Sequence, residues 1–156
     1  MNFESIDDIL NYAIEKEIEA AEFYMELSEM ESSPSSKDSK NALIEFAEQE
    51  RKHEKMLINL KTSSEKIENY HFKKVTDLKR SDYIVDIEYE KGMPFNDILR
   101  IAMKREEKAY KLYNEITVKV DDDEFKKVFQ ILANEESKHK NILEVMYDDY
   151  MAGQGD

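Results

Sequence analysis

The chain has 156 residues, of which 40% are hydrophobic and 38% are charged, and its formal net charge is −13 at pH 7. This length suits one domain with a single core. The acidic balance argues against nucleic acid or an anionic membrane surface as a partner, because both attract basic patches. The absence of cysteine excludes disulfides, thiolate nucleophiles, zinc ribbons and iron–sulfur clusters. With only three glycines and two prolines, the chain is expected to form long helices.

The N-terminal residues are acidic and lack the basic-then-apolar order of a signal peptide. No apolar run approaches the roughly 18 residues that a membrane-spanning helix needs. We therefore expect a cytoplasmic protein.

Helical periodicity predicts two helices in the first half of the chain. The first runs from about Ile6 to Met30, and Ser5 and Asp8 stand at the spacing of a capping box before it. A run of serines around one proline, residues 32–36, ends this helix. The second helix runs from about Asp38 to Ile67.

Two further helices are predicted in the second half. The third begins near Pro94, a residue that suits a first helical turn, and continues to about Val118. The acidic run 121–123 offers caps for the start of the fourth, which ends at about Tyr150. A short polar tail, residues 151–156, follows the predicted domain of residues 1–150.

The connections predict how these helices are arranged. The first and third connections are short, so each joins an antiparallel pair. Residues 68–93 form one long connection without a helical stripe, a length that is unusual for a plain loop. The chain is therefore expected to be all-α, an antiparallel four-helix bundle whose second and third helices are joined by a crossover along its length. Tyrosines of the crossover are expected to be exposed, where they could form a dimer interface.

Apolar residues at alternating four- and three-residue spacings mark the face that each helix buries in the bundle. Each of these four faces also carries one glutamate near the middle of its helix. In the second and fourth helices, a histidine follows on the same face three residues later. The six polar residues are Glu17, Glu50, His53, Glu106, Glu136 and His139.

Four buried glutamates that converge in one core need a source of positive charge. A lone buried carboxylate is costly, and four together also repel one another. They must therefore be protonated or surround a cation, and two divalent cations would balance their charge. Each Glu-x-x-His pair lies on one helix face, so both of its side chains can reach one metal. Oxygen-rich ligation with two nitrogens favours iron, with manganese as the alternative.

The chain also repeats itself. Residues 13–24 parallel residues 102–113, and residues 46–57 parallel residues 132–143. One Glu-x-x-His sequence arises easily by chance in a chain rich in glutamate. Two copies, each at the centre of an apolar face and each paired with a glutamate on the preceding helix, are much harder to obtain by accident.

Four other residues are candidates for supporting the metal ligands. Tyr24 and Tyr113 follow the first-helix and third-helix glutamates by seven residues. They are either core aromatics or hydroxyl donors to a ligand carboxylate across the bundle. Gln49 and Glu135 directly precede the glutamates of the two Glu-x-x-His pairs, and either could orient the histidine of the other helix.

These features resemble the rubrerythrin branch of the ferritin-like superfamily over roughly residues 8–148. Two Ala-x-x-x-Glu-x-x-x-x-x-x-Tyr segments and the two Glu-x-x-His segments carry the resemblance. It implies a ferritin-like bundle in which Glu50 and Glu136 bridge two irons, the other two glutamates are terminal ligands, and each histidine binds one iron. It also implies a non-haem di-iron oxidoreductase that reduces hydrogen peroxide or dioxygen in defence against oxidative stress.

Two departures from that family, and one difference from bacterioferritins, refine the expectation. Rubrerythrins carry an extra glutamate three residues after the third-helix ligand, where this chain has Ala109, with Ala20 at the matching place in the first helix. The site is thus closer to the symmetric six-ligand pattern of bacterioferritins, and the two alanines could leave space for a small oxidant. Arg51 stands where bacterioferritins have a haem-ligating methionine, so no haem is expected. Without cysteine for a rubredoxin domain, an external electron donor such as a rubredoxin is expected.

Two other functions stay open at this stage. The chain could provide the ferroxidase centre of an iron-storage protein, which assembly into a large cage would indicate. It could also be a non-catalytic helical module that binds another protein, which full stability without metal would indicate. We expect a homo-oligomer, and a dimer is favoured.

Overall fold

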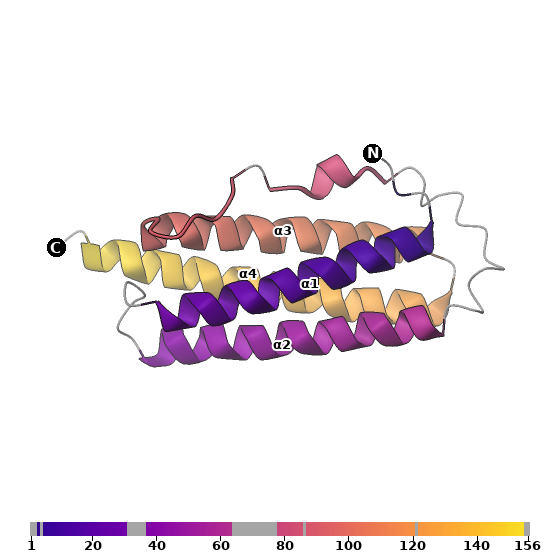
Figure 1. Cartoon of the computed structure of the whole chain (residues 1–156), viewed down its shortest axis with the longest axis horizontal. Coiled ribbons are helices and arrows are strands. Elements are labelled where there is room, and N and C mark those ends of the chain that lie inside the picture. The colour runs from indigo at the N-terminus through magenta and orange to yellow at the C-terminus, as the bar shows by residue number, and fades with distance from the viewer. Residues whose placement is uncertain are drawn as a thin grey trace.

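The computed structural model describes residues 3, 5–30, 37–63, 78–85, 87–120 and 122–154. Its elements are α1 (Ile6–Glu29), α2 (Lys37–Thr62), the short 3-10 helix η3 (Arg80–Tyr83), α3 (Phe95–Lys119) and α4 (Asp123–Gln154). The four long helices lie side by side with their axes roughly aligned (Figure 1). Because α1 packs along α2 and α3 packs along α4, the predicted all-α bundle of two hairpins is confirmed.

Side chains cap the starts of two helices as the sequence predicts. The Oγ atom of Ser5 accepts a hydrogen bond from the backbone N–H of Asp8 at 3.1 Å. At the start of α4, Oδ1 of Asp122 accepts one from the backbone N–H of Glu124 at 2.9 Å. Each bond satisfies a donor that the first helical turn leaves without a partner.

Helix α2 ends at Thr62, five residues before the predicted end at Ile67. The hydroxyls of Thr62 and Ser63 donate to the backbone oxygen of Asn59 at 2.9 Å and 3.1 Å. These bonds satisfy a carbonyl of the last turn, so the helix ends where its apolar stripe stops. Residues 64–77, like the serine-rich run 32–36 and Asp121, lie outside the described residues.

Helix α4 is longer than predicted and continues through most of the predicted tail to Gln154. Tyr150, near this end, packs on Phe95 of α3 with ring centroids 5.3 Å apart. Aromatic pairs at this spacing are attractive. The contact therefore anchors the last turns of α4 on the start of α3, so the helix does not stop at Tyr150.

The crossover runs along α3 on one side of the bundle (Figure 1). Tyr83 is buried at 5% exposure, and its hydroxyl donates to Glu115 of α3 at 2.5 Å. Tyr89 is half-buried, and its hydroxyl donates to Glu26 of α1 at 3.3 Å. The expectation that these tyrosines are exposed was wrong, because they fasten the crossover to the two helices beneath it.

Two apolar clusters fill the bundle, one towards each end, and the middle of each helix lies between them. One contains Leu10, Leu57, Ile116 and Phe129, and the other contains Leu27, Leu43, Leu99 and Leu143. The predicted apolar faces are buried, except that Ala20 and Ala109 are only half-buried. None of the described helices is both long and apolar enough to span a membrane.

A buried and an exposed neighbour on α4 provide a test of this core. Leu143 is fully buried, whereas Ile142 is 42% exposed. Leu143→Ala is expected to lower the free energy of unfolding by about 2–5 kcal/mol, because it leaves a cavity. Ile142→Ala removes similar atoms from the surface and should cost far less. Urea denaturation of both metal-free variants, monitored by circular dichroism, measures the difference. Equal losses would contradict the assigned faces of α4.

Candidate metal centre

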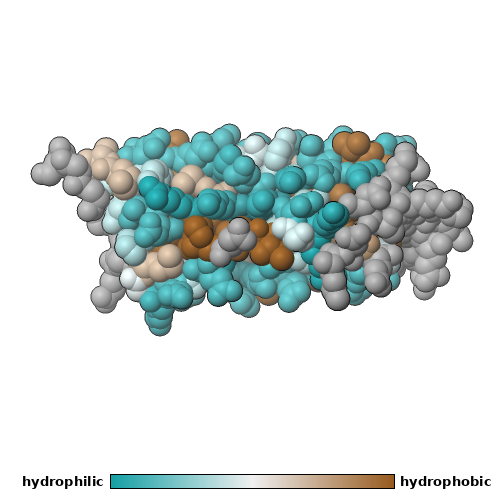
Figure 2. Space-filling model, turned by 90° about the horizontal axis from the view of Figure 1, so that it is seen from above, coloured by the Kyte–Doolittle hydropathy of each residue, from teal (hydrophilic) through white to brown (hydrophobic). Residues whose placement is uncertain are grey.

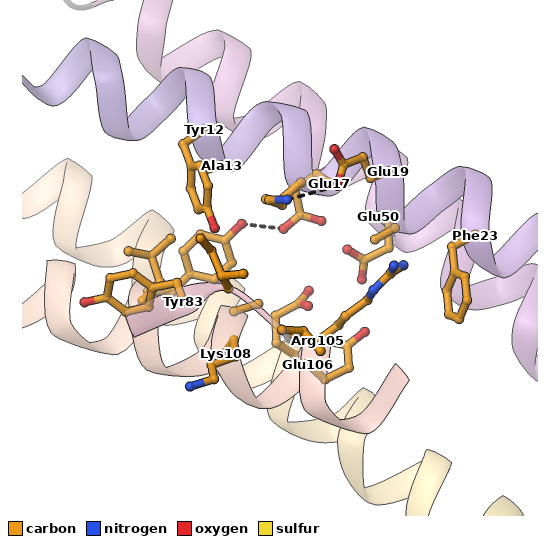
Figure 3. Close-up of a pocket in the computed structure, with 18 of the residues that line it drawn as sticks. Tyr12, Ala13, Glu17, Glu19, Phe23, Glu50, Tyr83, Arg105, Glu106 and Lys108 are labelled. Carbon is orange, nitrogen blue, oxygen red and sulfur yellow. Dashed lines mark hydrogen bonds and ion pairs between the residues drawn. The ribbon is translucent and has the colours of Figure 1, made fainter. Parts of the chain in front are cut away.

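A layer of charged side chains lies between the two apolar clusters. Each long helix contributes one glutamate, and α2 and α4 each add a histidine three residues later. The six side chains are only 1–2% exposed: Glu17, Glu50, His53, Glu106, Glu136 and His139. Figure 3 shows Glu17, Glu50 and Glu106 turned towards one another from three helices. The structure therefore brings together all six residues that the sequence analysis singled out.

These side chains form two overlapping groups of four. Within each group, the atoms that could bind a metal lie within 4.8 Å of one another. One group is Glu17, Glu50, His53 and Glu136, and the other is Glu50, Glu106, Glu136 and His139. Because Glu50 and Glu136 belong to both groups, two cations held here would share two carboxylates.

Several atoms of the cluster are buried without a hydrogen-bond partner. They are Oε2 of Glu17, Oε1 of Glu50, Nδ1 of His53, Oε2 of Glu106, Oε1 of Glu136 and Nδ1 of His139. Nδ1 of His139 lies 2.9 Å from Oε1 of Glu50, and Nδ1 of His53 lies 3.0 Å from Oε1 of Glu136. These pairs are close but lack hydrogen-bond geometry. Buried polar atoms normally have partners, so unpartnered oxygens and nitrogens facing one another fit a site for cations.

Two tyrosines hold the glutamates of α1 and α3 from across the bundle. The hydroxyl of Tyr113 on α3 donates to Oε1 of Glu17 on α1 at 2.5 Å. The hydroxyl of Tyr24 on α1 donates in turn to Oε1 of Glu106 on α3. Burial, and then the nearby carboxylates, raise the pKa of both tyrosines well above the usual value. Both hydroxyls therefore stay protonated and act as donors, while their rings also fill the core.

Each histidine is oriented by the opposite hairpin. Nε2 of His53 on α2 pairs with the carboxylate of Glu135 on α4, and Nε2 of His139 on α4 pairs with the amide oxygen of Gln49 on α2. Both partners offer an acceptor, so Nε2 carries the hydrogen and Nδ1 faces the glutamates. The predicted role of Gln49 and Glu135 in orienting the histidines therefore agrees with these contacts.

The protonation of the cluster follows from burial and crowding. Burial, followed by the charge of a neighbouring carboxylate, raises the pKa of Glu50 and Glu136 well above the usual value. Burial lowers the pKa of His53, but the adjacent carboxylates of Glu136 and Glu17 outweigh this effect and raise the pKa to about 11. Without metal, the centre therefore retains protons that metal ions would displace.

A cavity of about 430 Å³ reaches the glutamates from the side where α1 faces α3. Ala20 and Ala109, which the sequence analysis expected to leave space, both line it. Sequence reasoning missed the crossover residues that also line the cavity, including Ile84, Val85 and Ile87. These residues follow no helical stripe, and they approach the centre only through the folded path of the crossover, so no local pattern could have identified them.

Residues 8–147 match the model of the family described as rubrerythrin. The fold is similar to that of a Thermotoga maritima protein described as a ferritin-like diiron-carboxylate protein, with a TM-score of 0.74 and 23% identity over 96% of this chain and 99% of that one. It is also similar to a hypothetical protein from Pyrococcus furiosus, with a TM-score of 0.70 and 30% identity over 93% of this chain and 89% of that one. No curated protein matches the sequence.

The raised pKa values predict how the stability of the metal-free protein depends on pH. The folded chain holds protons on Glu50, Glu136 and His53 that the unfolded chain releases at lower pH. The free energy of unfolding should therefore fall as the pH rises above about 4.5, and the contribution of His53 should be lost between about pH 6.5 and about pH 11. Denaturant titrations in the presence of a chelator measure this slope.

A pair of isosteric variants isolates the contribution of the buried groups. Glu50→Gln with Glu136→Gln removes both buried carboxyls, so the decline with pH should become shallower. Glu48→Gln with Glu107→Gln removes two carboxylates from exposed positions and is the control for net charge. If both double variants show the same slope, surface repulsion rather than the buried cluster causes the decline.

Proposed function

The chain belongs to the rubrerythrin family, and from this premise we propose that its buried centre binds two iron ions and reduces hydrogen peroxide. The observation that carries the proposal is the pair of overlapping four-residue groups that share Glu50 and Glu136. Two buried glutamates and two Glu-x-x-His pairs on four helices are the ligand pattern of di-iron carboxylate bundles.

The residues present fit two such ions. Four carboxylates balance the charge of two divalent cations, and the cluster has six buried atoms without a hydrogen-bond partner. We propose that Glu17 and His53 would complete one position and that Glu106 and His139 would complete the other, with Glu50 and Glu136 shared. The predominance of carboxylate oxygen, together with imidazole nitrogen, suits iron, with manganese as the alternative metal.

The reaction needs two electrons and two protons for each peroxide, since H₂O₂ + 2 e⁻ + 2 H⁺ gives two molecules of water. A bound ferrous pair would supply both electrons. The protein's part is to keep the site dry and its ligands fixed. The hydroxyls of Tyr24 and Tyr113 hold the outer glutamates, and Gln49 and Glu135 hold the histidines. Such supporting contacts set both the position and the basicity of metal ligands.

We propose that the electrons that restore the ferrous state come from outside these 156 residues. The 156 residues contain no cysteine, so they cannot form a rubredoxin-type iron site. We propose a separate rubredoxin-like donor. Dioxygen as the oxidant, and ferroxidase activity leading to iron storage, are the competing functions, and family membership is what favours peroxide over them.

The shared glutamates and the single histidines predict different losses of metal. Glu50→Ala should abolish binding at both positions, because Glu50 belongs to both groups of four. His53→Ala and His139→Ala should each weaken one position and leave about one ion per chain. Glu48→Ala, on the exposed face of α2, is the control and should retain two ions. Anaerobic titration with ferrous iron, with helicity checked by circular dichroism, measures the stoichiometry. Retention of two irons by Glu50→Ala would contradict the assignment of the site.

Rapid mixing tests the choice of oxidant. The protein loaded anaerobically with ferrous iron is mixed with hydrogen peroxide and, separately, with dioxygen, and the absorbance of the ferric product is followed. We expect peroxide to oxidise two irons per chain faster than dioxygen does. Faster oxidation by dioxygen, followed by uptake of many irons per chain, would instead indicate iron storage.

A further inference from the structure

The cavity reaches the glutamates on the side of the centre that α1 and α3 form. On α2 and α4, His53 and His139 follow the shared glutamates by three residues, and their rings stack 6.2 Å apart. On α1 and α3, Ala20 and Ala109 occupy the matching positions, and both border the cavity. The imidazoles therefore close one side of the pseudo-symmetric centre, and the alanines leave the other side open.

The wall between the glutamates and the surface combines hydrophobic side chains with charged ones, which are Lys16, Glu19, Glu88, Arg105 and Lys108. Ala13 and Phe23 belong to α1, Leu112 belongs to α3, and Ile84 and Val85 belong to the crossover. Figure 3 shows the labelled glutamates between Tyr83 on one side and Phe23 on the other. A molecule that fills the cavity would thus meet both apolar and charged side chains along its body and the buried glutamates at its inner end.

The cavity is far larger than a two-oxygen oxidant requires. Its volume is about 430 Å³. A water molecule takes up only about 30 Å³ in the liquid, and hydrogen peroxide is of similar scale. Sites for small organic ligands span about 300–1,000 Å³ and are lined mainly by apolar side chains. The size therefore matches an organic molecule better than peroxide alone, and the apolar part of the lining fits a hydrocarbon group.

The crossover forms an apolar roof that is accessible from outside. Ile84 and Ile87 line the cavity, yet they are 52% and 46% exposed. Figure 2 shows hydrophobic side chains gathered midway along the face on which the crossover lies. Tyr83 holds one end of this roof to α3, and Tyr89 holds the other to α1. An apolar molecule would therefore find hydrophobic surface at the rim as well as inside the cavity.

We propose that this cavity binds the hydrocarbon part of a small organic hydroperoxide, R–OOH, with its peroxide end at the glutamates. The proposal rests on the proposed function and names a substrate class for the same centre. The O–O bond breaks as R–OOH + 2 e⁻ + 2 H⁺ gives R–OH and water. The two electrons come from the ferrous pair of the proposed function, and the protons come from solvent.

Binding is tested without turnover by the product alcohol of one such hydroperoxide. Cumyl alcohol is titrated into the metal-free and the zinc-loaded protein by calorimetry. We expect saturable binding of one molecule per chain to at least one of these forms. Ala109→Leu fills the cavity from α3, and Ala20→Leu fills it from α1, so each should weaken binding by about tenfold or more. Ala152→Leu, at an exposed position of α4, is the matched control and should bind like the unaltered protein.

Reactivity is tested by mixing the ferrous protein with cumene hydroperoxide and with hydrogen peroxide under the same conditions. We expect cumene hydroperoxide to oxidise the unaltered protein with a larger rate constant than hydrogen peroxide does. The ratio of the rate constant for cumene hydroperoxide to that for hydrogen peroxide should fall about tenfold or more in Ala109→Leu and in Ala20→Leu. It should not fall in Ala152→Leu. Circular dichroism checks that each variant is folded. Because the two cavity variants lie on different helices, the test can still be made if one of them does not fold.

The outcomes separate this proposal from the function on which it rests. Oxidation by hydrogen peroxide, with no binding of cumyl alcohol and no preference for cumene hydroperoxide, would overturn the organic substrate and leave the peroxidase function intact. Binding of cumyl alcohol, with no oxidation by either peroxide, would overturn both the hydroperoxide assignment and the proposed function.

Discussion

Four carboxylates buried side by side are the constraint on which the rest of this bundle depends. An apolar core disfavours each charge, and the charges also disfavour one another. Burial and crowding raise the pKa of Glu50 and Glu136, so without metal the cluster keeps protons. The tyrosine hydroxyls and histidine rings around it supply hydrogen-bond donors. The two apolar clusters at the ends of the bundle then provide the stability that lets so polar a layer persist.

The two halves of the centre are alike in position but not in charge. His53 pairs with a carboxylate, Glu135, whereas His139 pairs with a neutral amide, Gln49. A carboxylate partner makes an imidazole a stronger electron donor than an amide partner does. Two metals bound here would therefore not be equivalent, even though each position has two shared glutamates, one further glutamate and one histidine. The difference between the two histidines thus comes from Gln49 and Glu135.

The sequence was most informative where structure repeats at helical spacing. The apolar faces, the six clustered side chains and the partners Tyr24 and Tyr113 all follow from spacings within single helices. Helix ends were less predictable, because the end of α2 depends on the hydroxyls of Thr62 and Ser63, and the end of α4 depends on a contact between Tyr150 and Phe95. The crossover was least predictable. Its residues have no periodicity, and their burial is decided by helices that are distant in sequence.

The crossover, which the sequence predicted least well, is also the part of the chain that borders the cavity leading to the buried glutamates. The imidazoles fill the side between α2 and α4, so any approach from the α1–α3 side passes beneath the crossover. Since α2 and α3 run in the same direction, the connection between them must travel back along the bundle, and here its path lies over the α1–α3 side (Figure 1). The four helices thus determine which side chains converge at the centre. Ile84, Val85 and Ile87 of the crossover line the cavity that leads to it.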